Sequence, residues 1–222
     1  MTAGPGSPPP YPPGFFDRMD DADDATFYAP ERLVTHIDDA AIAAVGDLYA
    51  FLGVAGRVLD LMGSWVSHFV EPPDHLTVLG MNPRELEANP MAMDLVRHDL
   101  NQNPTLPFAD ATFDDAVCCV SVDYLTRPVE VFAEVARILR PGGRFVVTWS
   151  NRCFPTKAIR GWLMAGEDDR IHIVRSYFER SQRFGDVVTD RRIEPSRFGD
   201  PLDAAWAVRT RAPGAASGRR PA

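Results

Sequence analysis

The chain has 222 residues, of which 45% are hydrophobic, so it is long enough to bury the core of one domain. Its formal net charge of -8 repels phosphate backbones and anionic lipid, and no stretch gathers more than two adjacent basic residues, as at Arg219 and Arg220. We therefore expect neither nucleic acid nor a membrane as a partner, and no apolar run approaches the ~20 residues that span a bilayer.

Both ends of the chain are poor in residues that build a core. Residues 1–24 open with proline runs and end in an acidic run, and residues 213–222 contain only Gly, Ala, Ser, Arg and Pro. Such segments bury too little apolar surface to offset the entropy lost on ordering. The prediction is one folded domain over residues 25–212 between two disordered tails.

The cysteines and the first residues indicate a cytoplasmic protein. Cys118 and Cys119 are adjacent, so in a strand they point to opposite faces and do not bridge, and Cys153 is the third cysteine. Reduced thiols are typical of a reducing compartment. The first residues also lack the basic start and apolar run of a secretory signal.

Short apolar segments alternate with helical patterns along the chain. The expected strands are residues 57–61, 76–81, 95–98, 115–121 and 144–149, followed by two more around 187–193 and 204–210. The first five are apolar almost throughout, which is typical of strands buried on both faces of a parallel sheet. Helices are expected over residues 38–52, behind an Asp N-cap, and over residues 128–140, which start at a proline. This order predicts a doubly wound α/β fold with a mostly parallel, seven-stranded sheet whose last strand is antiparallel.

The middle of the chain resembles a known family. Residues 106–114 read Leu-Pro-Phe-Ala-Asp-Ala-Thr-Phe-Asp and are followed by a strand, a helix and the turn Leu-Arg-Pro-Gly-Gly at residues 139–143. In this order they resemble the central block of the type 11 methyltransferases, over roughly residues 58–149. Residues 64–68 and 150–158 look like a methyltransferase-like subgroup of bacteria and plants. The resemblance implies the Rossmann-like fold of class I methyltransferases, S-adenosylmethionine as cofactor and a small-molecule methyl acceptor.

The resemblance also implies a cofactor turn after the first strand. In the family an acidic residue is followed by an apolar residue and then by glycines that alternate with small residues, because the backbone passes close to the methionine part of the cofactor. Here the turn keeps Asp60 but has the single glycine Gly63, followed by Ser64. Ser121, after the fourth strand, reaches the same edge of the sheet.

Two further strand ends complete the implied cofactor site. The second strand of the family ends in an acid that grips both ribose hydroxyls, whereas Asn82 offers a neutral amide at the matching position. If Asn82 is the ribose contact, an Asp in its place is expected to bind more tightly. Asp99 and Leu100 match the family's pair at the third strand, where a carboxylate and the next backbone N–H contact the adenine.

Five further side chains are candidates for placing the methyl acceptor: Asp123, Tyr124, Asn151, Arg152 and His36. Arg152 suits a carboxylate or phosphate on a substrate, or pairs with a surface acid. Tyr124 either faces the transferable methyl group or packs as a helix aromatic. His36 belongs either to a lid over the site or to a solvated cap. We expect no role in the site for His68, which is interpreted as a helix residue, or for Lys157, which is interpreted as a solvated charge.

Two classes of function remain open on the sequence alone. The first is a methyltransferase. The second is an inactive module of the same fold that senses a ligand or binds a partner. The loss of the glycine turn and of the ribose acid favours this second class. Trp65, in the turn, forms either a wall over the methionine part or a buried packing contact. The five histidines are scattered and no C-x-x-C occurs, so no metal site is expected.

Overall fold

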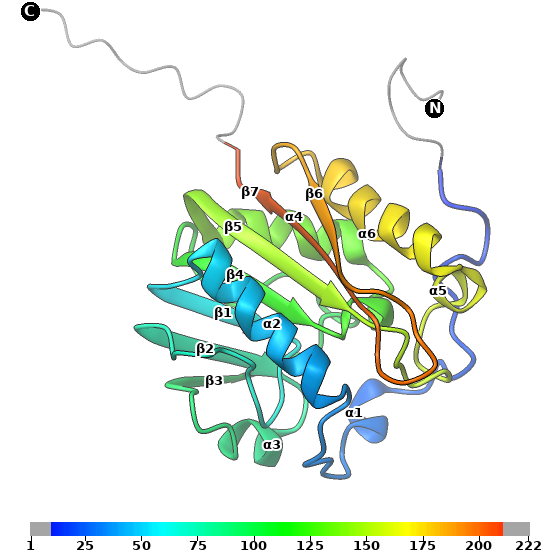
Figure 1. The fold of residues 1–222 in the computed structure, drawn as a ribbon, viewed down its shortest axis with the longest axis horizontal. Helices are drawn as coiled ribbons and strands as arrows, with labels where there is room; N and C mark the ends of the chain where they lie inside the picture. Colours follow the sequence, from blue (N-terminus) through cyan, green and yellow to red (C-terminus); the bar gives the residue numbers. More distant parts are fainter. Residues whose placement is uncertain (1–9, 211–222) are drawn as a thin grey trace, which may run out of the picture.

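The computed structural model describes residues 10–210, and its centre is a seven-stranded sheet in the order β3-β2-β1-β4-β5-β7-β6 (Figure 1). The strands are β1 Arg57–Leu61, β2 His75–Gly80, β3 Asp94–Arg97, β4 Phe113–Cys119, β5 Leu139–Trp149, β6 Val188–Ile193 and β7 Leu202–Val208. The first five are parallel, and β7 runs antiparallel to both β5 and β6. The predicted doubly wound α/β fold is confirmed.

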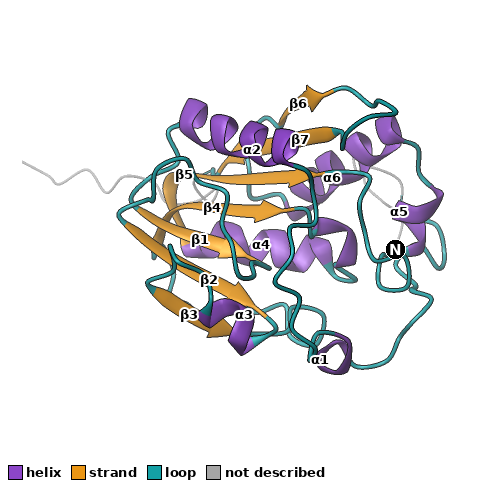
Figure 2. Ribbon diagram, turned by 60° about the horizontal axis from the view of Figure 1, so that its bottom comes forward, coloured by secondary structure: helices purple, strands orange, loops and turns teal. Residues whose placement is uncertain are grey.

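Helices cover both faces of the sheet (Figure 2). They are α1 Asp24–Phe27, α2 Asp39–Leu52, α3 Pro83–Glu87, the 3-10 helix η1 Val122–Tyr124, α4 Pro128–Ile138, α5 Arg160–Met164 and α6 Glu167–Ser181. One apolar cluster joins α2 to the face formed by Val58, Val78 and Val146. The other joins α4 and α6 to the opposite face. The sheet is therefore buried on both sides, which is why its central strands read as continuous apolar runs.

The helix α4 is shorter than predicted. It begins at Pro128, as expected, but ends at Ile138 because Leu139 already pairs with Phe113 in the sheet. The glycines that follow are required there. Gly142 adopts φ 91°, and a Cβ on Gly143 would collide with the backbone oxygen of Asp114.

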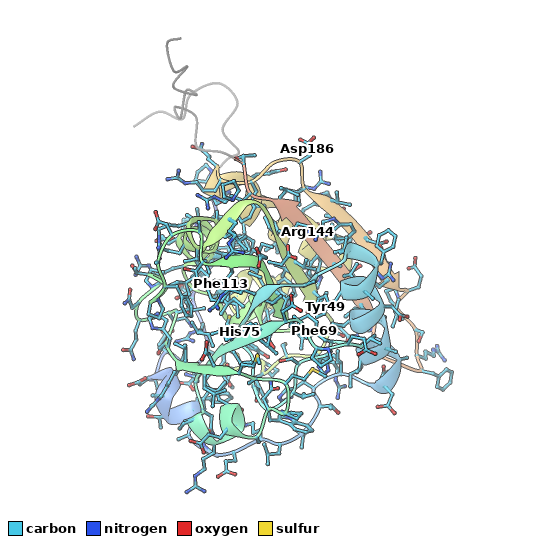
Figure 3. All side chains as sticks on the ribbon, turned by 90° about the vertical axis from the view of Figure 1, so that its left-hand side faces the viewer. Tyr49, Phe69, His75, Phe113, Arg144 and Asp186 are labelled. Atoms are coloured by element: carbon cyan, nitrogen blue, oxygen red, sulfur yellow. The ribbon has the colours of Figure 1, made fainter. Side chains whose placement is uncertain are left out.

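No helix lies between β1 and β2, a stretch that the structure describes in full. Residues 62–74, here named the β1 loop, join β1 to β2 without a helix, although parallel strands are usually joined through one. The loop packs against α2, where the rings of Phe69 and Tyr49 lie 4.9 Å apart (Figure 3). A Cβ on Gly46 of α2 would lie 2.9 Å from Val70 Cγ2, so glycine lets the loop approach closely. His68 accordingly lies in a loop and not in the helix that was expected.

The expected disorder of residues 1–24 is wrong for residues 10–24. Tyr11, Phe15 and Phe16 pack against the cluster under α4 and α6, and the rings of Tyr11 and Phe15 stack at 4.9 Å. Phe15 rests on Gly161, whose backbone N–H donates to the Phe15 carbonyl at 2.8 Å. These three aromatic side chains bury enough apolar surface to order the segment, although its high content of Pro and Asp had predicted disorder. Residues 1–9 and the predicted tail at 213–222 lie outside the described residues.

A buried lysine anchors the N-terminal segment, defined as residues 10–38. Lys157 is the only lysine in the sequence, and its side chain is 0% exposed, so the expectation of a solvated charge is wrong. Its ammonium lies 2.8 Å from the carbonyl oxygen of Ala22 and 3.1 Å from the carboxylates of Asp20 and Asp24. A compact ammonium with several acceptors is the form in which a lysine charge is tolerated inside a protein.

Asp24 completes this anchor. Burial raises the pKa of Asp24, but hydrogen bonds from Arg18, Asn101 and Lys157 outweigh it and hold the pKa below its ordinary value of 3.8. Arg18 reaches both carboxylate oxygens at 2.8 Å. Asp24 is therefore ionised at neutral pH and joins the N-terminal segment to the turn after β3 and to the loop after β5.

We expect the substitution Phe15→Ala to lower the free energy of unfolding by about 2 kcal/mol, because it removes a half-buried ring from an apolar cluster. Chemical unfolding followed by circular dichroism measures the change. Met19→Ala is the matched control, since Met19 is exposed in the same segment, and its effect should stay within about 0.5 kcal/mol. Equal stability of F15A and the parent would contradict the packing described.

We expect Lys157→Met to cost about 3 kcal/mol at pH 7, because Asp20 and Asp24 lose their ammonium partner. The folded-state pKa of Asp24 lies below its ordinary value of 3.8, so its stabilising contribution is present above that pH and is lost as the pH falls through the folded-state pKa. The difference between K157M and the parent should therefore shrink in acid. Urea unfolding at pH 7 and pH 3 checks this, and a difference that is the same at both pH values would contradict it.

Candidate functional site

A cavity of about 430 Å³ opens beyond the carboxyl ends of β1 to β4. Its walls are the strand ends, the β1 loop, the N-terminal segment and the loop after β5. All of the residues predicted for the site line it except Asp123: His36, Asp60, Gly63, Ser64, Asn82, Asp99, Leu100, Ser121, Tyr124, Asn151 and Arg152. Its size lies within the range of small-ligand sites, about 300–1,000 Å³.

The turn after β1 keeps a glycine-like backbone without most of the glycines. Met62 adopts φ 59°, a left-handed conformation that favours glycine. Gly63 is needed for space, since a Cβ there would lie 2.7 Å from Val78 Cγ1 and 2.9 Å from Asp60 Oδ2. Its N–H donates to the Leu79 carbonyl at 2.9 Å, which holds the turn against β2. A tight turn is therefore formed here with Gly63 and a left-handed Met62.

The end of β2 has no room for a side chain. The strand ends at Gly80, two residues before Asn82, so a glycine occupies the strand terminus. A Cβ on Gly80 would collide with the backbone oxygen of Gly63 in the neighbouring turn. No acidic residue at this position is compatible with the observed backbone.

Asn82 is fully engaged by backbone groups. Its amide nitrogen donates to the carbonyls of Tyr28 and Ala29 at 3.0 and 3.2 Å. Its oxygen accepts from the N–H groups of Arg84 and Glu85 at 3.0 and 3.4 Å, which caps α3. Any hydrogen bond from Asn82 to a ribose would have to displace one of these, so in the structure Asn82 ties the N-terminal segment to α3.

Glu85 is a pocket residue that the sequence reasoning missed. Its side chain is buried, with 8% exposed, and lines the cavity. One carboxylate oxygen accepts from the backbone N–H of Arg32 at 2.8 Å, and the other accepts from Ser64 Oγ at 2.6 Å. The signal was present in the spacing, because Asn82 followed by a Glu three residues later is a capping pattern that places the acid on the first turn of a helix.

Asp60 orders the β1 loop from beneath. Its carboxylate accepts from Ser67 Oγ at 2.5 Å, and Asn89 Nδ2 donates to both Ser67 Oγ and the Ser64 carbonyl at 2.9 and 3.0 Å. Burial raises the pKa of Asp60 to about 7, against the opposing effect of the Ser67 hydrogen bond. This network holds the β1 loop against the end of β1 and against Asn89.

Asp99 and Leu100 lie at the end of β3, as the family resemblance implies. Asp99 Oδ1 accepts from the backbone N–H groups of Asn101 and Gln102 at 2.9 and 3.2 Å, which caps the turn. The second carboxylate oxygen has no partner among the described residues. Leu100 is buried beside it. Asp99 is therefore held in place with one oxygen available to a ligand.

Aromatic side chains form the wall opposite the strand ends. The Tyr124 hydroxyl accepts from the Phe154 N–H at 2.9 Å, and burial raises the pKa of Tyr124, so the hydroxyl keeps its proton. Trp65 Nε1 donates to the Val34 carbonyl at 3.0 Å and so bridges the β1 loop and the N-terminal segment. The His36 ring meets Phe154 edge-on at 5.3 Å. This wall joins three separate parts of the chain.

Two basic groups at the mouth differ in how they are held. Arg32 lies over the Phe27 ring at 4.7 Å and donates to the Phe27 carbonyl at 2.9 Å. Arg152 is 63% exposed, and its ion pair with a carboxylate oxygen of Asp200 is long at 3.7 Å. Arg32 is thus part of the wall, whereas Arg152 is a loosely held charge beside the exposed Asn151.

Asp123 does not reach the cavity, contrary to the prediction that it faces the acceptor with Tyr124. The two lie in η1, where three residues complete a turn, so adjacent side chains point in directions about 120° apart. Asp123 is 2% exposed, and its Oδ2 has no hydrogen-bond partner among the described residues. Burial raises the pKa of Asp123 to about 8. The structure therefore leaves Tyr124 as the cavity residue of this pair.

The remaining reactive groups form no second centre in residues 10–210. Within that range no three His, Cys, Asp or Glu side chains gather closely enough to hold a metal ion. Cys118, Cys119 and Cys153 are unpaired, with Cys118 and Cys119 on opposite faces of the sheet as expected. None of the helices in this part of the chain has the length and apolar character needed to cross a membrane.

Comparisons of sequence point to one family. Residues 64–147 match the model of a methyltransferase domain, that of the type 11 family. An uncharacterized methyltransferase of Mycobacterium tuberculosis is 30% identical over 154 residues, which cover 65% of this chain and 54% of the relative. The ubiquinone/menaquinone biosynthesis C-methyltransferase of Roseobacter denitrificans is 33% identical over 94 residues, covering 42% of this chain and 36% of that enzyme. The chain thus spans about half the length of the mycobacterial relative that it matches.

Solved structures share the fold. A Burkholderia thailandensis 1,6-didemethyltoxoflavin-N1-methyltransferase, solved with that compound and S-adenosylhomocysteine, superposes with a TM-score of 0.55 at 18% identity over 78% of this chain and 79% of that one. A SAM-dependent methyltransferase from Archaeoglobus fulgidus gives 0.54 at 13% identity, over 77% and 95%. Such identities show the fold alone. The chain therefore shares the fold of class I S-adenosylmethionine-dependent methyltransferases, and its residues 64–147 match the methyltransferase domain of the type 11 family.

Proposed function

We propose that the chain binds S-adenosylmethionine in the cavity at the strand ends and transfers its methyl group to a small molecule. The observation that carries the proposal is the convergence of the β1 turn, Asp99, Leu100 and Tyr124 on one cavity of ligand size. The cofactor, when bound, supplies an electrophilic methyl group on its sulfonium. The net charge of -8 disfavours a polyanionic acceptor.

The residues of the cavity fit most of this cofactor. Asp99 keeps a carboxylate oxygen free for the adenine amino group, and the left-handed Met62 lets the backbone of the turn approach a ligand. Tyr49 also lines the cavity; it is 2% exposed, and its hydroxyl lies beside the side chain of Thr148. The adenine and methionine ends therefore have candidate contacts, whereas the end of β2 offers none to the ribose.

The chain's own residues can exclude water and place an acceptor. The bridge from Trp65 to Val34 closes the β1 loop against the N-terminal segment, and methyl transfer depends mainly on alignment of the reacting atoms in a dry site. The Tyr124 hydroxyl accepts from the Phe154 N–H, which fixes its position, and burial raises its pKa so that it stays protonated. Partial burial lowers the pKa of His36 below its ordinary value of 6.5, against the opposing charge of Glu85, so at pH 7 His36 is neutral and able to take a proton.

Isothermal titration with S-adenosylmethionine tests the proposal. We expect the parent protein to bind with a micromolar dissociation constant and Asp99→Asn to weaken binding by about 1–3 kcal/mol, the range for losing a charged hydrogen-bond partner. The Asn variant retains the oxygen that caps the turn, so the fold is preserved. Asp186→Asn makes the same charge change in an exposed turn outside the cavity (Figure 3) and should leave binding unchanged. No binding by the parent at millimolar ligand would favour an inactive module instead.

We expect Asn82→Asp to weaken cofactor binding and lower the melting temperature, the reverse of the expectation from the sequence. The carboxylate would face the carbonyl oxygens of Tyr28 and Ala29 and lose both donors that hold the N-terminal segment. Asn103→Asp is the control, because Asn103 uses only its side-chain oxygen, as the acceptor from Thr105 N–H. Titration and thermal unfolding of both variants measure the effect, and tighter binding by N82D would restore Asn82 as the ribose contact.

A further inference from the structure

Among residues 10–210, four carboxylates line the cavity, and three of them already have other roles. Asp24 is shared between Arg18, Asn101 and Lys157. Asp60 lies beneath the β1 loop on Ser67 and Asn89, and Asp99 caps the turn at the end of β3. The fourth is Glu85, which lies on α3 directly after β2. It is the only one of the four that lies next to the strand end where the family resemblance places the ribose.

Glu85 is held from both walls of the cavity. Ser64 Oγ, in the β1 loop, donates to one oxygen at 2.6 Å, and the backbone N–H of Arg32, in the N-terminal segment, donates to the other at 2.8 Å. A carboxylate has about four acceptor positions, and these two bonds use half of them. The carboxylate is therefore fixed in direction, buried, and still able to accept from two further donors.

The residues between β2 and Glu85 supply no other acid beside this strand end. Gly80 has no side chain, and a Cβ there would collide with the turn at Gly63. Asn82 has committed its amide nitrogen and oxygen to four backbone groups. The carboxylate that vicinal hydroxyls beside this strand end could contact is therefore that of Glu85 on α3.

We propose that Glu85 receives the ribose hydroxyls of the cofactor and so replaces the acid that the family carries at the end of the second strand. This rests on the proposed binding of S-adenosylmethionine. Glu85 acts as a binding residue that selects ribose-bearing ligands, and Ser64 positions it.

Titration with S-adenosylhomocysteine and with its 2′-deoxy and 3′-deoxy counterparts tests the role directly. The parent should bind the ribose form at least roughly tenfold more tightly than the deoxy forms, because each deoxy form leaves a charged acceptor without a donor. Glu85→Gln should weaken the ribose form by roughly tenfold and reduce the discrimination to less than about threefold. The control is Glu87→Gln on the exposed side of α3, which should change neither value.

The ratio of affinities separates a contact from a structural effect. A variant that merely loosens the pocket would weaken all three ligands equally, so an unchanged ratio in E85Q overturns the assignment. Ser64→Ala, which removes the positioning hydroxyl but keeps the carboxylate, should lower the ratio partly and provides the test if E85Q does not fold. If the parent binds none of the three ligands, the proposed function fails together with this role. If it binds them with no discrimination, only the role of Glu85 fails.

Discussion

Two glycines at the ends of adjacent strands touch through their backbones, and the design of the cavity depends on this contact. Gly63 of the β1 turn lies against Gly80 of β2, and the hydrogen bond from Gly63 N–H to Leu79 fixes the approach. The contact leaves no room for a side chain at Gly80. In the same turn, Ser64 lies within hydrogen-bond distance of Glu85 and orients its carboxylate.

The second determinant is a chain segment that arrives from outside the sheet. The N-terminal segment provides one wall of the cavity, and three kinds of contact hold it: aromatic packing of Phe15 on α5, the ammonium of Lys157, and the side chains of Asn82 and Glu85. The last two are themselves pocket residues. We expect ligand binding to affect the seating of this wall, because Glu85, the proposed ribose contact, also accepts from the Arg32 N–H of the segment.

The fold was predictable from the sequence because buried parallel strands leave a strong pattern. All seven strands were placed to within a few residues, with β5 extended backwards through the turn at Pro141. The positions of the cavity residues followed from the strand ends. What failed depended on contacts between distant residues. The packing of Phe15, the burial of Lys157 and the engagement of Asn82 by Tyr28 are made by partners 50 or more residues away, which no local pattern encodes.

The solitary lysine gives the molecule a built-in reporter. Within these 222 residues Lys157 is the one side-chain amine, and it is sealed beneath the N-terminal segment by Asp20, Ala22 and Asp24. An acylating reagent can reach this amine only when the N-terminal segment opens locally. The rate of covalent labelling at Lys157 therefore reports how often the segment opens, as amide exchange reports local opening of the backbone. Mass spectrometry of the peptide that contains Lys157 thus measures the opening of this wall of the cavity at one residue.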